Sequence, residues 1–279
     1  MAELSYCAEQ VRRFDNDRFL CTLFAPPFER EALAALYAFN LEIARVRESV
    51  REPMLGRIRL QWWRDAVEAI FAGVPQREPV AAALAGAVDR FGLGREHLDR
   101  LIVAREFDLD DRPPATLEDL VGYAEGTGAP LVKLSAEVMG GRDPGVMAAA
   151  EDLGTAWALT GLIRAVPFHA RARRLYLPAA LSRKAGLDVF AMFERGSTPG
   201  LPAVIEAVAG RAEQHLAAAR AARRSVPAQA LPAFLPATLA GLYLKRIAAA
   251  GYDPFDARLR AVGAQRLVVL AVSQLRRRY

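Results

Sequence analysis

The sequence has few cysteines and no long apolar run, and both absences exclude whole classes of protein. Only Cys7 and Cys21 occur in 279 residues, without the spacing of a zinc site or a disulfide framework, so we expect buried thiols in a reducing compartment. No window is apolar over the length that a membrane-spanning helix needs. The first ten residues contain acids and no apolar stretch, which predicts neither a secretory signal nor a mitochondrial transit peptide. We therefore expect a soluble or peripheral protein, either bacterial and cytoplasmic or the mature form of an organellar one.

The charge balance is modestly basic, with a formal net charge of +5 and an isoelectric point near 9.5. The basic residues form no recognisable base-reading motif and are not interleaved with aromatic side chains, so no nucleic-acid partner is expected. An anionic ligand or an anionic membrane surface fits the charge equally well. The arginines at 276–278 would add about 1 kcal/mol each to attraction by an anionic bilayer, which places the protein peripherally on the inner face of the inner membrane, or the matrix side if it is mitochondrial.

Strand-like alternation is also absent, and alanine, leucine, arginine and glutamate dominate, which predicts a single all-α domain over residues 1–279. A capping box at Thr116–Asp119, N-caps before proline at Asp143 and Thr198, and glycines at 92 and 140–141 mark helix ends. Helices are expected at 4–15, 28–50, 53–72, 78–91, 94–111, 116–139, 144–166, 199–225, 230–249 and 256–276, with short helical turns around 178–194.

A segment without acids runs from Asp152 to Asp188. Its basic residues are Arg164, Arg171, Arg173, Arg174, Arg183 and Lys184. Arginines of this kind hold a phosphate or carboxylate through paired hydrogen bonds without a metal. The alternative is a solvated basic face.

Within this segment, Ala158–Pro178 resembles the second aspartate-rich motif of the squalene/phytoene synthase family, whose aspartates hold magnesium against a prenyl diphosphate. The residues that match this motif at its spacing, without a gap, are Leu159, Thr160, Arg164, Arg174, Tyr176, Leu177 and Pro178. The acids are missing. Ala165 stands at the first aspartate position and His169 at the second, at the four-residue spacing that shares one helix face.

An upstream stretch, Leu36–Ser49, is similar to the family's first aspartate-rich motif, and its four acidic positions are occupied by Ala44, Arg45, Glu48 and Ser49. One glutamate is weak support for magnesium, which prefers carboxylate oxygens. A divalent ion about 5 Å from the Arg45 guanidinium would be repelled by roughly 6 to 7 kcal/mol at an effective dielectric of about 20. Alternatively, Arg45 points to solvent and pairs with Glu48 one turn on.

Three further features of the sequence bear on the predicted site. The acids Asp108, Asp110 and Asp111 are interpreted as a solvated helix end before Pro113 rather than a replacement metal site. At least one of the adjacent indoles at 62–63 is expected in the core. By resemblance to the family, the glycines at 126 and 128, on the helix that also carries Tyr123, leave room for a lipid chain.

A narrower resemblance, to the complex I assembly factor 6 branch of the superfamily, runs along nearly the whole chain. Its most specific part is the altered magnesium motif Arg164-Ala165-x-Pro167-x-His169; other matching residues include the runs 38–40, 59–63, 123–125, 173–174 and 232–235. The resemblance implies an isoprenoid synthase-like helical bundle around a central cavity. It also implies a non-catalytic role in respiratory complex I assembly, with a membrane-arm subunit or assembly intermediate as partner and an isoprenoid or other lipid as ligand.

The alternative is a head-to-head prenyl transferase that joins two prenyl diphosphates, and only this alternative requires magnesium. In a transferase that has lost its metal ligands, Arg164, Arg171 and Arg174 would replace the metal as an anion clamp. A third possibility is a lipid or isoprenoid carrier, which would keep the cavity and need neither prenyl transfer nor complex I. We assign no catalytic residue, metal ligand or cofactor. The candidates for ligand or anion binding are Arg45, Glu48, Tyr123, Arg164, His169, Arg171, Arg174 and Tyr176.

Overall fold

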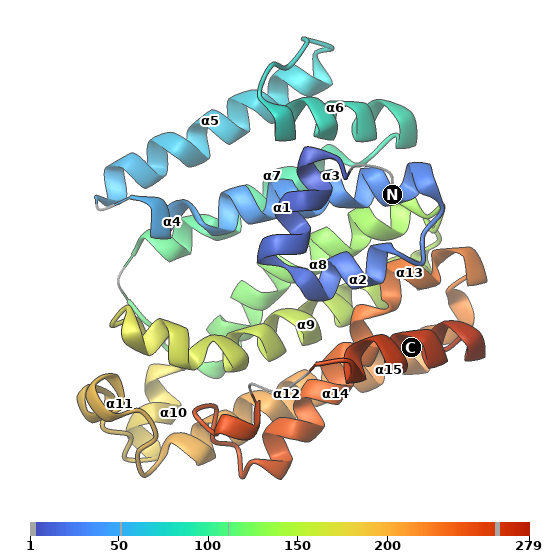
Figure 1. Ribbon diagram of the computed structural model, residues 1–279. Helices are drawn as coiled ribbons and strands as arrows, with labels where there is room; N and C mark the ends of the chain where they lie inside the picture. Colours follow the sequence, from blue (N-terminus) through green and yellow to red (C-terminus); the bar gives the residue numbers. More distant parts are fainter. Residues whose placement is uncertain (1–3, 51, 111, 260–262) are drawn as a thin grey trace.

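The computed structural model describes residues 4–50, 52–110, 112–259 and 263–279, and every regular element in these ranges is helical (Figure 1). The N-terminal half contains α1 (Tyr6–Phe14), α2 (Asn16–Thr22), α3 (Pro27–Ala44), α4 (Val46–Ser49), α5 (Pro53–Phe71), α6 (Pro79–Phe91), α7 (Arg95–Ala104), η1 (Arg105–Leu109) and α8 (Leu117–Val138). The C-terminal half contains α9 (Pro144–Arg171), α10 (Ala179–Lys184), α11 (Val189–Arg195), α12 (Leu201–Ala221), η2 (Ala222–Ser225), η3 (Ala228–Ala230), α13 (Leu231–Phe234), α14 (Pro236–Ala249), η4 (Ala257–Leu259) and α15 (Gln265–Arg276).

Helices α8 and α9 form the centre of the bundle, between α5 and α6 at one end and α12, α14 and α15 at the other (Figure 1). Small residues let their backbones approach closely. A Cβ added to Gly128 of α8 would lie 2.1 Å from the carbonyl oxygen of Gly154 in α9. Gly126 of α8 is similarly confined on the side of α7, because a Cβ added to it would lie 2.9 Å from the Cβ of Ala104. These glycines therefore serve helix packing, although Gly128 also lines the central cavity.

Several helix ends follow the sequence prediction. Thr116 and Asp119 form the capping box of α8, Pro144 begins α9, and Gly92 ends α6 in the left-handed conformation with φ of 59°. Trp63 is buried while its neighbour Trp62 is exposed, and Cys7 and Cys21 are buried free thiols. Burial raises the pKa of the Cys7 thiol to about 11.

Other boundaries were predicted wrongly. The expected helix 28–50 breaks at Arg45, which separates α3 from α4. The helix α2 was missed, because Asp15 ends α1 and its side chain caps α2 at once. Thr198 is not an N-cap, since α12 begins only after Gly200, whose φ of 85° suits glycine.

Proline 167 does not end α9, contrary to the expectation of a helix over 144–166. The helix continues to Arg171, because the burial of Val166 and Ala170 beside the proline offsets the backbone hydrogen bond that Pro167 cannot donate. In the expected helix 256–276, residues 260–262 lie outside the described part, and the regular helix α15 begins at Gln265. No helix in the described ranges combines the length and apolar character needed to cross a bilayer.

Candidate functional site

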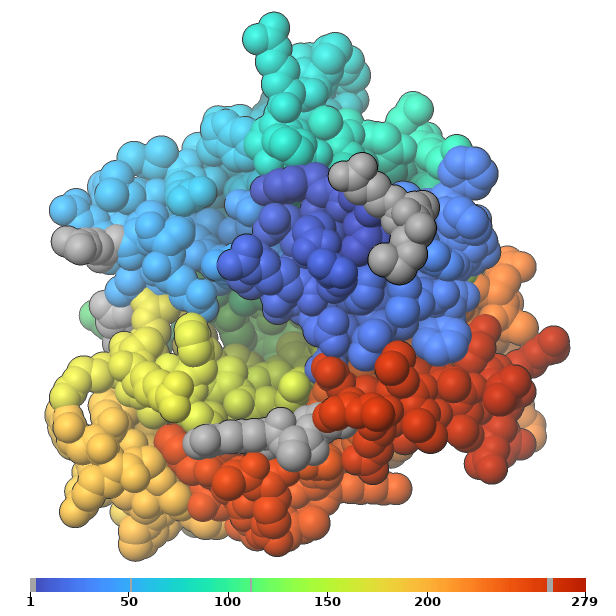
Figure 2. Space-filling model, viewed as in Figure 1, coloured from blue at the N-terminus to red at the C-terminus, as the bar shows by residue number. Residues whose placement is uncertain are grey.

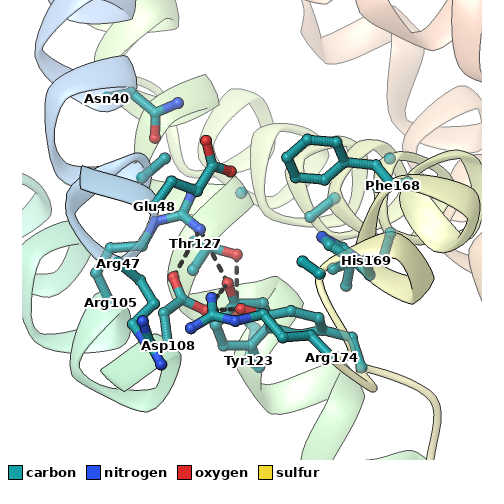
Figure 3. A pocket seen from close by; sticks show the side chains of 18 of the residues that line it. Asn40, Arg47, Glu48, Arg105, Asp108, Tyr123, Thr127, Phe168, His169 and Arg174 are labelled. Carbon is teal, nitrogen blue, oxygen red and sulfur yellow. Dashed lines mark hydrogen bonds and ion pairs between the residues drawn. The ribbon is translucent and has the colours of Figure 1, made fainter. Parts of the chain in front are cut away.

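A cavity of about 600 Å³ lies between α3 and α4 on one side and α9 on the other, with η1 and α8 forming its floor (Figure 3). In Figure 2 the face of the molecule is hollowed between the blue N-terminal helices and the yellow end of α9, and green segments are visible deep inside. The central cavity is lined by Arg18, Asn40, Ala44, Arg47, Glu48, Val50, Arg105, Asp108, Tyr123, Thr127, Gly128, Trp157, Ala158, Gly161, Leu162, Ala165, Phe168, His169, Ala172, Arg174 and Tyr176.

The two altered motifs face each other across this cavity. Ala44 and Glu48 line one wall, and Ala165 and His169 line the other. Because α9 continues through Pro167, positions 165 and 169 share one face of a single helix. Four of the six replaced acidic positions therefore line the cavity, and the exceptions are Arg45 and Ser49, of which Ser49 is exposed and accepts a hydrogen bond from Arg59.

Arg45 is turned away from the cavity, which corrects its assignment as a ligand candidate. Its exposed guanidinium lies 4.1 Å from the centroid of the Phe14 ring. It therefore neither repels a cation in the cavity nor forms the alternative pair with Glu48 that its spacing had allowed. The helix break at Arg45 changes the direction in which the following side chains leave the helix. Arg47 therefore lines the cavity in place of Arg45.

Asp108 is buried at the cavity floor and its oxygens are already engaged by the protein. The hydroxyls of Tyr123 and Tyr176 donate to Oδ1 at 2.7 and 2.8 Å, and Arg105 Nη1 donates to Oδ2 at 3.3 Å. Burial, with the nearby Asp108 carboxylate, raises the pKa of Tyr176 and holds the pKa of Tyr123 well above its usual value, so both remain protonated donors. The interpretation of Asp108 as part of a solvated helix end was wrong, whereas its neighbour Asp110 is exposed.

His169 is part of the cavity wall rather than a surface residue. Its ring lies 4.5 Å, centroid to centroid, from that of Tyr176, and its Nδ1 is buried without a hydrogen-bond partner. Burial lowers the pKa of His169 to about 4, with Arg174 a smaller contributor, so the ring is neutral at pH 7. The side chain of Asn40, 6% exposed, also has an oxygen without a hydrogen-bond partner at this cavity.

The charges that line the cavity favour an anion over a divalent cation. Four arginines and two acids leave a formal charge of +2 when His169 is neutral. Arg105 lies against Asp108, and no group of three potential metal ligands occurs among the described residues. Magnesium needs free carboxylate oxygens in octahedral geometry. The residues present therefore do not fit a magnesium–diphosphate group.

Two predicted candidates, Arg164 and Arg171, lie on a neighbouring face of α9 and line a different pocket, which shares Phe168 with the central cavity. Arg164 Nη1 donates to the carboxylate of Asp17 at 3.1 Å. The three-arginine clamp is therefore not formed, because only Arg174 of that set reaches the central cavity. Of the eight candidates, the five that line it are Glu48, Tyr123, His169, Arg174 and Tyr176.

Sequence reasoning missed Arg18, Asn40, Arg47 and Arg105 in the cavity lining. Arg18 belongs to the missed helix α2, and its guanidinium lies between the rings of Tyr37 and Trp157. The spacing of Arg105 and Asp108 could have indicated an ion pair within one helical turn. No local signal linked Asp108 to Tyr123 and Tyr176, which are 15 and 68 positions away from it.

Comparisons with known proteins agree with this architecture. Residues 11–269 match the squalene/phytoene synthase family. The NADH dehydrogenase (ubiquinone) complex I assembly factor 6 of Mus musculus is 35% identical over 274 residues, covering 98% of this chain and 82% of that protein. A phytoene synthase of Rhodobacter capsulatus is 27% identical over 276 residues, covering 98% of this chain and 81% of that protein.

Solved structures share the fold. A dehydrosqualene synthase in complex with a ligand superposes with a TM-score of 0.83 at 20% identity, covering 97% of this chain and 94% of that one. The squalene synthase of Alicyclobacillus acidocaldarius gives a TM-score of 0.78 at 22% identity, covering 89% of this chain and 94% of that one. The sequence match over almost the whole length and the same helical arrangement lead to one conclusion: this chain belongs to the squalene/phytoene synthase family.

Proposed function

We propose that this protein acts in the assembly of respiratory complex I and does not transfer prenyl groups. The proposal is supported by the 35% identity to complex I assembly factor 6 over nearly the whole chain. The observation that carries it is the cavity, where alanine and histidine stand at acidic positions of the family and the buried Asp108 is occupied by three protein donors.

The chemistry of the alternative explains why the cavity matters. Joining two prenyl diphosphates requires a diphosphate to leave, and metal ions normally stabilise the charge that develops. Here a divalent ion on Asp108 would lie close to the Arg105 guanidinium, and at about 5 Å the repulsion is roughly 6 to 7 kcal/mol at an effective dielectric of about 20. Each loss of about 1.4 kcal/mol of transition-state stabilisation slows a reaction tenfold.

The cavity itself is retained, and we propose that it holds an isoprenoid or another lipid without a metal ion. Trp157, Leu162 and Phe168 offer apolar contact, and Arg47 and Arg174 provide positive charge at the same cavity. The bound molecule would then stabilise the assembly-competent protein rather than react.

We further propose that this protein binds a membrane-arm subunit or an assembly intermediate of complex I, and that it does so at the inner face of the inner membrane. Helix α15 exposes Leu267, Val268 and Leu275, and the arginines at 276–278 follow directly. An apolar stripe beside a basic end is the pattern of a helix that lies on an anionic bilayer.

The enzyme question is tested by incubating the purified protein with magnesium and either farnesyl or geranylgeranyl diphosphate. We expect no diphosphate release above background, with the phytoene synthase of Rhodobacter capsulatus as the positive control. Sustained release of diphosphate with a C30 or C40 product would overturn the non-catalytic proposal and establish the prenyl transferase.

The assembly role is tested by complementation. Mouse cells that lack their assembly factor 6 receive this chain, targeted to mitochondria, and assembled complex I is measured on native gels. We expect partial recovery with the wild-type chain and less with an Asp108→Asn variant, scored against equal protein levels. Complex I levels that do not change, in these cells and after deletion of the gene in its own organism, would refute the role.

A further inference from the structure

A second pocket of about 470 Å³ lies on a neighbouring face of α9, between the ends of α9 and α14 and the start of α15. In Figure 1 the orange-red segments that follow α14 lie below the yellow end of α9. Four arginines line the pocket: Arg164, Arg171, Arg246 and Arg266. No acid occurs among the described residues that line it.

Two of the arginines are held in place by one buried carboxylate. Asp17, 7% exposed, accepts hydrogen bonds from Arg164 Nη1 at 3.1 Å, Arg266 Nη1 at 2.7 Å and the Tyr243 hydroxyl at 2.7 Å. The Arg164 guanidinium also lies 3.6 Å from the centroid of the Tyr243 ring. These contacts fix the guanidinium planes before any ligand arrives, which lowers the ordering cost of binding.

The pocket keeps a strong positive charge after this internal pairing. Four arginines and the adjacent Asp17 leave a formal charge of +3. Arg171 is exposed and forms no ion pair with any described residue. Arg171 follows Arg164 by seven positions, so both side chains leave α9 on the same face. Arginine side chains clustered in this way bind two oxygens of one phosphate through paired hydrogen bonds.

The remaining wall is apolar. Phe168, Ile247 and Phe255 line the pocket together with prolines, so an anionic group bound by the arginines would lie next to a surface suited to hydrocarbon. Phe168 also lines the central cavity and therefore forms part of the wall between the two spaces. Arg174 lies on the cavity side, which allows the two sites to be separated by substitution.

We propose that this pocket binds a phosphate group directly, without a metal ion, through Arg164, Arg171, Arg246 and Arg266, with any attached hydrocarbon against Phe168 and Phe255. The source of the phosphate is either a lipid headgroup or a small soluble phosphate. The proposal does not depend on the assembly role, because it concerns a site outside the central cavity.

The test is isothermal titration of the full chain with three probes in the presence of EDTA: dihexanoyl phosphatidic acid below its micelle concentration, inorganic phosphate and neutral dihexanoylglycerol. We expect both phosphate probes to bind and the neutral probe not to bind. Tighter binding of phosphatidic acid than of inorganic phosphate identifies a lipid source, and equal binding identifies a soluble phosphate.

Variants then place the site. Arg171→Gln should weaken binding of the phosphate probes by about tenfold or more, because it removes one charged donor pair. Arg183→Gln, an exposed arginine of the same acid-free segment, and Arg174→Gln, in the central cavity, should change the Kd less than twofold, about the error of such a comparison. Circular dichroism melting checks that each variant is folded.

Three results would overturn the proposal: no binding of either phosphate probe by the wild-type chain, binding that Arg171→Gln leaves unchanged, or binding lost in Arg174→Gln but kept in Arg171→Gln. The last result would place the phosphate in the central cavity.

Discussion

Asp108 is a buried carboxylate, and both of its oxygens accept hydrogen bonds from the protein's own donors. Two tyrosine hydroxyls share one oxygen and Arg105 contacts the other. Both members of the Arg105–Asp108 pair are largely buried, with side chains 14% and 6% exposed. A pair of this kind stabilises the fold only while it is complete, since either partner alone is a desolvated charge.

Replacing Asp108 with asparagine should therefore lower the free energy of unfolding by about 3 to 5 kcal/mol, because the Arg105 guanidinium is left without its counter-charge. Urea unfolding followed by circular dichroism measures the change. Asp110→Asn is the matched control. Asp110 is exposed and its Arg57 contact is 3.8 Å long, so less than about 1 kcal/mol is expected. Similar losses in both variants would contradict this account of Asp108.

His169 should make stability depend on pH between about 4 and 6.5. Its pKa is lowered from 6.5 to about 4 in the folded chain, so on acidification the unfolded chain binds the proton first. The contribution of His169 to stability is complete above pH 6.5 and is lost as the pH falls towards the folded pKa. At pH 5 the loss amounts to about 2 kcal/mol. Urea unfolding at pH 7 and pH 5 should show this loss in the wild type and a smaller loss in His169→Gln. Equal losses would show that His169 is not the titrating group.

Among the helices, the close contact of α8 and α9 fixes the cavity floor against one cavity wall. Gly128→Ala should lower the free energy of unfolding by about 2 to 3 kcal/mol, because the new methyl would meet the backbone of Gly154. Gly122→Ala, on the same helix and with nothing within 4 Å of the added Cβ, should raise stability by about 0.5 to 1 kcal/mol. Thermal melting of both variants decides the matter, and an unaffected Gly128→Ala would mean that the helices can separate without cost.

Most helices could be predicted because their signals are local. Apolar periodicity, the Thr116 capping box and the Gly92 helix end all act within a few residues. The errors arose where two local signals competed or a tertiary contact decided. Pro167 signalled an end that the packing of α9 overrides, and Asp15 both ends one helix and begins the next. The break at Arg45 had no local signal and changed which arginine lines the cavity.

For the molecule as a whole, the cavity is built from segments far apart in the sequence, which limits what the sequence could predict about it. Five residues that the resemblance singled out line one cavity: Glu48, Tyr123, His169, Arg174 and Tyr176. The resemblance could not assign Arg164 and Arg171 to the neighbouring pocket, because that depends on helix phase and on Asp17, 147 positions from Arg164. Nor could it identify Asp108 as the centre of a tyrosine and arginine network.

The formal charge of +2 at the cavity leads to a test on the intact protein. Millimolar magnesium chloride should leave the Tm unchanged relative to sodium chloride at equal ionic strength, because a ligand raises the Tm only when it binds the folded state more tightly. The phytoene synthase of Rhodobacter capsulatus, titrated in parallel with a prenyl diphosphate, is the comparison. A magnesium-dependent rise in the Tm of this chain would show that a cation site had survived.

Helix α9 contributes to two positively charged spaces, and its rotation about its own axis decides which side chains face each one. Each residue of an α-helix advances about 100° around the axis. An insertion of one residue before Arg164 would therefore turn Arg164 away from Asp17 and move His169 off the Tyr176 ring. A single-codon insertion should thus disable both spaces at once, whereas point substitutions should disable them one at a time.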